Sequence, residues 1–299
     1  MTARDDEAAR AFEPHRRRLT GLAYRMLGSL AEAEDIVQDA YLRWHGADRS
    51  AVADPRAYLS STVARLCLDQ LKSARVRREQ YVGQWLPEPI IDASAVSPDS
   101  ASELADDVSV ALMMTLERLS PLERAAFILH DVFDMSFDAV ASVLDRDAAA
   151  CRQLAARARA HVHEGRPRFK ASTADAAQLA EAFHQAVMSG DIVALGRMLA
   201  DDAVLYSDGG GKRLAALNPI RGKDRIIRFF EGLAQKQRLY VPQSLHRTLI
   251  NGLPGFVIVD VEGAVETLAL AIDDGRIAAL YSVRNPEKLG HLAQSGLSH

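Results

Sequence analysis

The sequence predicts a multidomain fold in which two all-α domains are followed by an α+β domain. Apolar residues recur at helical spacing through most of residues 6–165, whereas short apolar runs separated by turn residues dominate after residue 199. A chain of 299 residues is long enough for two or three domains with their own cores. We expect helical domains at 6–80 and 104–165, a linker at 81–103, an α+β domain at 174–290 and a tail at 291–299.

The composition is that of a globular protein, with 25% charged and 48% hydrophobic residues. No apolar run approaches the roughly 18–20 residues needed to span a bilayer, and the N-terminus does not resemble a signal peptide. Cys67 and Cys151 lie among apolar neighbours in helical patterns, which favours two buried free thiols over a disulfide. We therefore expect a cytoplasmic protein.

The charge is unevenly distributed along the chain. The net charge is −4, but the segment 56–78 is basic, the segment 85–134 is acidic and the segment 136–170 is basic again. Neutralisation of phosphates supplies most non-specific affinity for DNA. Two small basic elements around an acidic middle predict weak binding to free duplex DNA, and a partner that holds the DNA.

The first helical domain contains a polar surface stripe. A helix over about 6–29 ends at Gly28-Ser29, and Ser29 is placed to start the next helix. That helix has a core-facing apolar set, namely Ile36, Val37, Ala40, Tyr41 and Trp44. Asp35, Gln38, Asp39 and Leu42 share one face at spacings i, i+3, i+4 and i+7. A leucine on such a stripe favours a docking surface, with an ordinary solvated face as the alternative.

The third helix of this domain is basic outside its apolar face. It begins at Asp54-Pro55 and continues to about Glu79. Its buried set is Leu59, Val63, Leu66, Leu68 and Leu71, and the basic residues outside that set are Arg56, Arg65, Lys72 and Arg75. The C-terminal turns hold more arginines than the helix dipole explains, which suggests contact with phosphates.

The linker contains the sequence WLPEP, residues 85–89. Its two prolines favour an extended chain, and Trp85 and Leu86 need a surface to cover. A docking segment is therefore favoured over a solvated loop.

The second helical domain has a helix-turn-helix pattern. Helices over about 104–119 and 121–133 precede a short helix that Ser136 caps and a longer one that Asp147 caps. The longer helix buries Cys151, Leu154, Ala155 and Ala158 and exposes Arg152, Gln153, Ala156 and Arg159, with Arg157 at the edge. Arginine and glutamine suit bidentate recognition of guanine and adenine, so this is a candidate recognition helix. A helical hairpin that does not bind DNA is the alternative.

The α+β domain is expected to contain two helices, a strand, a third helix and three strands. Gly190 ends the first helix, Asp191 caps the second, which is expected to include Leu199, and Glu262-Gly263 and Asp274-Gly275 indicate hairpins. This order resembles the SnoaL-like cone related to nuclear transport factor 2. The polar candidates for a pocket in such a cone are His184, Tyr206, Asp208, Glu262 and Glu266. Their spacing does not compel acid–base chemistry, so we expect no catalytic activity and no cofactor. His161 and His163 stand at i and i+2 and point away from each other on a helix, so we expect surface histidines and no metal site.

Two helical motifs and three short motifs carry a more specific resemblance. EAEDIVQDAYLRW followed by DPRAYLSSTVARLCLDQLKSARVRR resembles region 2 of extracytoplasmic-function (ECF) sigma factors, and the helix-turn-helix resembles their region 4. WLPEP, DGGGK (208–212) and NPEKL (285–289) together match a subgroup with a fused SnoaL-like domain. Glu287 departs from that subgroup's usual aspartate, and Ala155-Ala156 departs from the common region 4 pattern, which leaves the target sequence open.

The resemblance implies roles for the residues named above. The β and β′ subunits of core RNA polymerase would contact Asp35, Gln38, Asp39 and Leu42. The −10 element of promoter DNA would contact Arg56, Arg65, Lys72 and Arg75, and the −35 element would contact Arg152, Gln153, Ala156, Arg157 and Arg159. Regulatory contacts between domains, in place of a separate anti-sigma factor, would involve Trp85, Leu86, Pro87, Asp208, Gly209, Gly210, Gly211, Lys212, Asn285, Pro286 and Lys288.

Two other functions remain as alternatives at this point. One is a ligand-sensing helix-turn-helix regulator that acts without polymerase. The other is a DNA-binding protein fused to a small-molecule isomerase or cyclase. A small molecule in the cone is a further candidate partner under the sigma-factor hypothesis as well.

Overall fold

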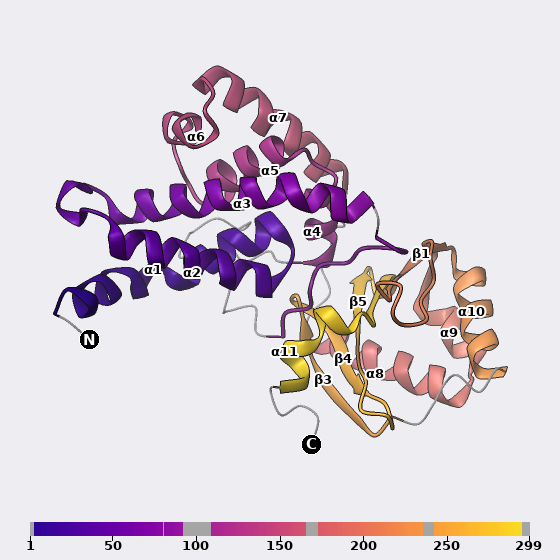
Figure 1. The fold of residues 1–299 in the computed structure, drawn as a ribbon. Helices are drawn as coiled ribbons and strands as arrows, with labels where there is room; N and C mark the ends of the chain where they lie inside the picture. Colours follow the sequence, from indigo (N-terminus) through magenta and orange to yellow (C-terminus); the bar gives the residue numbers. More distant parts are fainter. Residues whose placement is uncertain (1–2, 80, 92–108, 166–172, 236–241, 295–299) are drawn as a thin grey trace. The chain divides into compact units, whose positions relative to one another are not determined.

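The computed structural model describes residues 3–79, 81–91, 109–165, 173–235 and 242–294 (Figure 1). It divides into two compact units, one made of residues 1–79 and 93–166 and the other of residues 80–92 and 167–299. The first part of the linker therefore belongs to the same unit as the C-terminal domain.

The first helical block contains three helices joined at the capping residues that the sequence predicts. They are α1 (Ala3–Leu27), α2 (Leu30–Gly46) and α3 (Pro55–Glu79), with a short 3-10 helix, η1 (Arg49–Ala51), before α3. Ser29 Oγ accepts a hydrogen bond from the amide of Glu32 at 3.2 Å, and Asp54 Oδ1 accepts one from the amide of Ala57 at 3.1 Å. These bonds satisfy amides that have no partner within the helix, which confirms where α2 and α3 begin.

The apolar faces predicted for α2 and α3 are buried, apart from Tyr41. Trp44 of α2 is 1% exposed, and its indole nitrogen donates to the carbonyl of Ala8 at 3.2 Å. Leu59 and Val63 of α3 are fully buried, whereas Tyr41 is half-buried with its ring edge-on to Phe12. Both cysteines are free and buried.

The second helical block has the predicted helix-turn-helix at its C-terminal end. Its elements are α4 (Val110–Glu117), α5 (Pro121–Phe127), a π-helical turn η3 (Ile128–Val132), α6 (Phe137–Leu144) and α7 (Ala148–Gly165). Ser136 Oγ caps α6, and Asp147 Oδ1 accepts from the amide of Ala150 at 2.7 Å. The sequence predicts an uninterrupted helix over 121–133, but its last turn is π-helical. The predicted start of the preceding helix, residues 104–108, lies outside the described residues.

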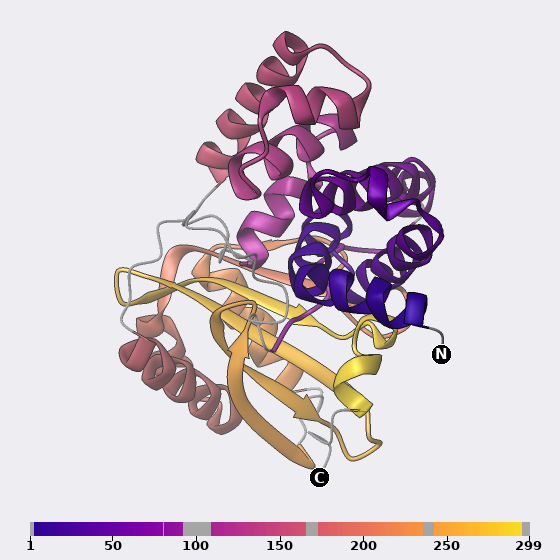
Figure 2. The same cartoon turned by 90° about the vertical axis from the view of Figure 1, so that its left-hand side faces the viewer.

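The C-terminal domain is the expected α+β fold. Its elements are α8 (Thr173–Ser189), α9 (Ile192–Met198), β1 (Leu199–Asp208), β2 (Ile220–Arg221), α10 (Lys223–Gln235), β3 (Ser244–Ile250), β4 (Leu253–Val259), β5 (Val265–Asp273), β6 (Arg276–Val283), η4 (Pro286–Lys288) and α11 (Gly290–Gln294). The sheet order is β2-β1-β6-β5-β4-β3, and β1 runs parallel to β6 while the other pairs are antiparallel. Figure 2 shows the curved sheet of this domain. Phe183 of α8 and Ile226 of α10 pack with Phe256 and Leu280 of that sheet.

Three local expectations for this domain are wrong. Leu199 begins β1 instead of ending α9, because its extended backbone pairs with Ile277 of β6. The strands β2 and β3 were not predicted; β2 is two residues long, and β3 forms the edge of the sheet. The turn Asn251-Gly252 joins β3 to β4 with both residues at positive φ, so this dipeptide was the available signal for the missing strand.

Candidate functional site

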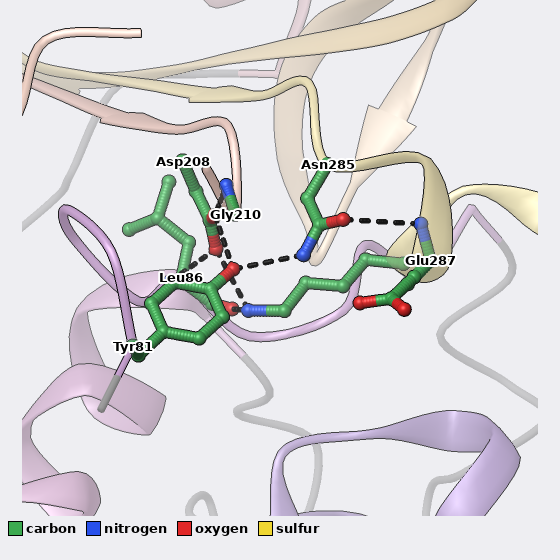
Figure 3. Close-up of polar contacts among 7 residues, drawn as sticks. Tyr81, Leu86, Asp208, Gly210, Asn285 and Glu287 are labelled. Atoms are coloured by element: carbon green, nitrogen blue, oxygen red, sulfur yellow. Dashed lines mark hydrogen bonds and ion pairs between the residues drawn. The ribbon is translucent and has the colours of Figure 1, made fainter. Parts of the chain in front are cut away.

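A buried carboxylate at the end of β1 holds the linker. Asp208 is fully buried, and its Oδ1 accepts from the Tyr81 hydroxyl at 2.5 Å and the Gly210 amide at 3.0 Å. Its Oδ2 accepts from the Leu86 amide at 2.9 Å and from Lys288 Nζ at 2.7 Å (Figure 3). A buried carboxylate is costly unless it is paired and hydrogen-bonded, and here every partner is a donor. Two of the four donors come from the linker.

Lys288 of η4 completes the charge balance. Its side chain is 11% exposed, and Nζ also donates to the carbonyl of Leu86. The ammonium lies 4.3 Å from the ring centroid of Trp85 and 5.1 Å from that of Tyr81. Such cation–π contacts favour a desolvated ammonium. Lys288 therefore contacts the linker at the backbone carbonyl of Leu86 and at the rings of Tyr81 and Trp85.

Asn285 links the Tyr81 hydroxyl to the turn that follows β6. Its Nδ2 donates to Tyr81 Oη at 2.9 Å, and its Oδ1 accepts from the amide of Glu287 at 3.1 Å, which caps η4. Burial and the hydrogen bond to Asp208 raise the pKa of Tyr81, so the hydroxyl remains a donor at neutral pH. We call Tyr81, Leu86, Asp208, Asn285 and Lys288 the linker clamp.

The glycines after Asp208 allow this close approach. Gly210 has φ +58°, and a Cβ there would overlap the side-chain amide of Asn285. A Cβ on Gly209 would overlap the carbonyl oxygen of Arg213. Lys212, the last residue of DGGGK, forms an exposed ion pair with Glu287. The two motifs therefore meet twice, once in the buried clamp and once at the surface.

A second set of contacts holds the C-terminal part of the described linker. The amide of Ile90 donates to Asn251 Oδ1 at 3.1 Å, and the amide of Asn251 donates to the carbonyl of Ile90 at 2.8 Å. His291 faces the Pro89 carbonyl at 3.0 Å and Glu88 Oε1 at 3.1 Å. The run from Leu86 to Ile90 is buried, and its two prolines bring no amide hydrogen that would need a partner there.

Sequence reasoning did not identify four of these contact residues, namely Tyr81, Glu88, Asn251 and His291. Glu88 lies within the WLPEP motif that the sequence singled out, and Asn251 lies in the hairpin turn described above. Neither Tyr81 nor His291 stands in a motif or a spacing that would have indicated its role. The partner of Tyr81, Asp208, is 127 positions away in the sequence, and the partner of His291, Pro89, is 202 positions away.

The structure places the predicted polymerase-facing and −10 residues on exposed helix faces. Asp35, Gln38, Asp39 and Leu42 are all exposed on α2, and Leu42 is 59% exposed. On α3 the side chains of Arg56, Arg65 and Lys72 are exposed, and Lys72 pairs with Asp69 at 2.9 Å. Arg75 belongs to α3, but its side chain lies outside the described residues.

The predicted −35 residues of α7 differ in their surroundings. Arg152, Gln153, Ala156 and Arg157 are exposed, whereas Arg159 is half-buried. Arg157 Nε is 2.9 Å from Glu123 Oε1, and Arg159 Nε is 2.7 Å from Asp131 Oδ1. Arg152 instead lies over the ring of Phe137, 5.4 Å from its centroid. His161 and His163 are exposed, and among the described residues no cluster of three or more His, Cys, Asp or Glu could hold a metal.

Arginines connect the two helical blocks. Arg124 of α5, 2% exposed, donates to the carbonyl of Met26 in α1 at 2.8 Å. In the other direction, Arg18 of α1 donates to the carbonyl of Phe133 at 2.6 Å. Arg65 of α3 donates to the carbonyl of Ser142 in α6 at 2.9 Å. We call Arg18, Arg65 and Arg124 the interblock arginines.

The five polar candidates for a pocket in the C-terminal domain lie in different surroundings. Asp208 lies under the linker, Glu262 is exposed in the turn between β4 and β5, and Glu266 pairs with Arg284 at 3.0 Å. A surface depression between α8, α9 and α10 contains none of the five. That these five side chains share a polar pocket therefore stays a prediction, and the partners described here are the linker for Asp208 and Arg284 for Glu266.

Comparison with known proteins identifies the class of the two helical blocks. The family model described as Sigma-70 region 2 matches residues 11–77, and the model described as Sigma-70, region 4 matches residues 109–162. These matches together span α1 to α7, apart from the start of α1 and the ends of α3 and α7. The helical blocks are therefore the two regions of a sigma factor.

Relatives that match over nearly the whole chain then define the family. The chain is 39% identical over 287 residues to "ECF RNA polymerase sigma factor SigJ" of Mycobacterium tuberculosis, covering 93% of this chain and 91% of the relative. It is 32% identical over 289 residues to "Probable ECF RNA polymerase sigma factor SigI" of the same species, covering 96% of each. A crystal structure of SigJ matches with a TM-score of 0.73 and 36% identity, over 93% of this chain and 97% of that chain.

The chain belongs to the ECF RNA polymerase sigma factors. It is a transcription initiation factor that works with core RNA polymerase and promoter DNA. Because the alignments to SigJ and SigI extend over more than nine tenths of each chain, they include the C-terminal domain. The resemblance stated from the sequence motifs is thus confirmed. Among the described residues, no helix is long and apolar enough to cross a membrane.

Proposed function

We propose that this sigma factor is regulated by its own C-terminal domain, which acts by holding the linker between regions 2 and 4. The observation that carries the proposal is Asp208, a buried carboxylate that receives two of its four hydrogen bonds from the linker. A domain that only followed the sigma regions would not need to bury the chain that joins them. The linker residues Trp85, Leu86 and Pro87, the DGGGK turn and the NPEKL segment are the regulatory elements in this proposal.

The separation of the promoter elements explains why the linker is a point of control. The −10 and −35 elements are about 25 base pairs apart, which is roughly 85 Å along the duplex at 3.4 Å per pair. A compact body of about 150 residues has a radius of gyration of only about 15 Å. Regions 2 and 4 therefore cannot bind both elements while the interblock arginines hold them together. The two regions must separate, and a linker held along part of its length restricts how they do so.

The contacts with polymerase and promoter complete the proposal. The exposed stripe of Asp35, Gln38, Asp39 and Leu42 is proposed to bind core RNA polymerase. Basic residues of α3 are proposed to contact the −10 element, and the exposed face of α7 is proposed to contact the −35 element. Because Arg65 is at present bonded to region 4, opening of the two regions would also release a residue for the −10 DNA. We propose the cytoplasm as the place where the protein meets these partners. A small-molecule ligand in the C-terminal domain remains a candidate partner that the contacts described do not test.

The test is run-off transcription with purified core RNA polymerase and the full-length protein. We expect Lys288→Met, which leaves Asp208 without its cation, to change the yield of promoter-dependent transcript at least threefold. An increase means that the clamp represses transcription, and a decrease at an unchanged affinity for core polymerase means that it supports transcription. The matched control is Lys212→Gln, which removes the exposed pair between the same two motifs and should leave the yield unchanged. Equal yields from wild type and Lys288→Met, with an equal affinity for core polymerase, would contradict the regulatory proposal.

A further inference from the structure

The three arginines on the exposed side of α7 are not equivalent. Arg157 and Arg159 are each paired with a carboxylate of the preceding helices, Glu123 and Asp131. Arg152 lies one to two turns closer to the start of α7 and is exposed. Among the described side chains no carboxylate is paired with Arg152, and its recorded contact is with the ring of Phe137. Its hydrogen-bond donors therefore remain available for another partner.

Phe137 is itself held in place by a histidine. It is the first residue of α6, and its ring stacks on the imidazole of His130, with 3.8 Å between centroids and 29° between planes. His130 Nδ1 lies 2.8 Å from the carbonyl oxygen of Met135. Since a carbonyl can only accept, Nδ1 carries the hydrogen, and this bond fixes the orientation of the imidazole. We call His130 and Phe137 the aromatic shelf.

We infer that Phe137 is a positioning residue that prepares Arg152 to recognise one guanine of the −35 element. A guanidinium held over an aromatic ring by a cation–π contact, as Arg152 is, keeps its planar set of N–H donors available. Those donors match O6 and N7 of guanine in the major groove. This contact also reduces the freedom of the Arg152 side chain before DNA binds, so less entropy is lost when the bidentate contact forms. The inference rests on the proposed contact of α7 with the −35 element.

Because the aromatic shelf contacts only Arg152 among these arginines, we expect it to affect the base preference at a single position of the −35 element. Arg157 and Arg159 need not be positioned in this way, because their ion pairs already orient them and leave fewer donors for DNA. They suit phosphate contacts, which carry no sequence information. Loss of the shelf should therefore weaken one base preference and leave the rest of the −35 preference unchanged.

The experiment is transcription by core RNA polymerase and full-length protein from a duplex library with randomised −35 and −10 elements, followed by sequencing of the transcripts. Arg152→Ala should reduce the preference for guanine at one −35 position by at least about fivefold. Phe137→Leu should reduce it at the same position by about two- to fivefold, the range expected for a cation–π contact. Phe137→Tyr keeps the aromatic face and should retain the preference. In the double variant, Phe137→Leu should have no additional effect on that position beyond Arg152→Ala.

The results separate this inference from the proposal on which it rests. If Arg152→Ala relaxes one −35 position but Phe137→Leu leaves it intact, the shelf has no positioning role, whereas α7 still reads the element. A uniform loss at all positions in Phe137→Leu, together with a lower melting temperature, means that Phe137 is merely structural and overturns the inference. If neither Arg152→Ala nor Gln153→Ala alters any −35 preference, the proposed contact of α7 with the −35 element itself fails.

Discussion

The motifs DGGGK and NPEKL form two ion pairs with each other, and the two pairs differ in almost every physical respect. The Asp208–Lys288 pair is buried. Asp208 accepts a hydrogen bond from the Leu86 amide, and Lys288 donates one to the Leu86 carbonyl and contacts two aromatic rings. Lys212–Glu287 is exposed, with side chains 49% and 65% accessible to solvent. Water screens the charges of the exposed pair. In the buried pair, a charge that loses its partner is left uncompensated because water does not reach it. The comparison indicates that the functional weight of both motifs lies in the buried pair.

The largest expected effect comes from removing one partner of the buried pair. Lys288→Met should destabilise the C-terminal unit by about 3–5 kcal/mol, because it leaves the Asp208 carboxylate buried without its cation. The double variant Asp208→Asn/Lys288→Met removes both charges and should recover part of the loss. Urea unfolding followed by circular dichroism measures both effects. If the losses of stability caused by Asp208→Asn and by Lys288→Met simply add in the double variant, the two side chains do not act as a pair.

A backbone change at the same site should have the next largest effect. Gly210→Ala places a Cβ in a left-handed conformation and against the Asn285 amide, so we expect a loss of about 1–3 kcal/mol. Gly263 is the matched control, because it also has positive φ but has nothing within 4 Å of the added Cβ. Thermal unfolding of both alanine variants separates the strain from the collision. An equal loss in the two would show that crowding by Asn285 contributes nothing.

A smaller and pH-dependent effect is expected at Tyr81. Its folded-state pKa is raised, first by burial and then by Asp208, so its contribution to stability is complete below the ordinary tyrosine pKa of about 10 and is lost as pH rises above that value. Tyr81→Phe should cost about 1–2 kcal/mol at pH 7, because Asp208 loses a donor. The variant should also lose stability less steeply than the wild type between pH 10 and 11. Parallel curves in urea titrations over that range would contradict the assigned cause.

The smallest effect is expected at the exposed pair. Lys212→Gln and Glu287→Gln should each change the unfolding free energy by less than about 0.5 kcal/mol, and salt should reduce even that difference. Unfolding curves at two ionic strengths provide the measurement. A loss as large as that of Lys288→Met would remove the distinction between the two pairs.

The parts of the fold that depend on local pattern were predicted well. The caps at Ser29, Asp54, Ser136 and Asp147 involve residues only three positions apart, so the sequence contains both partners of each bond. Apolar spacing likewise identified the buried faces of α2, α3 and α7. The edge strand β3 was missed because its burial does not alternate regularly, and the π-helical turn at Ile128 has no clear local signal.

The candidate sites likewise contain residues that the local sequence indicates and contacts that it does not indicate. The exposed residues of α2 and the basic face of α3 follow from helical periodicity, and the motifs WLPEP, DGGGK and NPEKL could be recognised as sequences. The sequence did not indicate that Glu123 and Asp131 would pair with two of the three arginines on α7. It also did not indicate that His130 and Phe137 would hold the third.

The sequence by itself determined the capped starts of α2, α3, α6 and α7, the family and the set of motifs, because each of these depends on residues that are near one another along the chain. Only the tertiary structure decided which atoms meet in the linker clamp. Tyr81 and Leu86 reach Asp208 across 127 and 122 positions, and Lys288 reaches Leu86 across 202. A hydrogen bond depends on distance and direction in space, and over such separations these are set by how the sheet, the turn after β6 and the linker pack together.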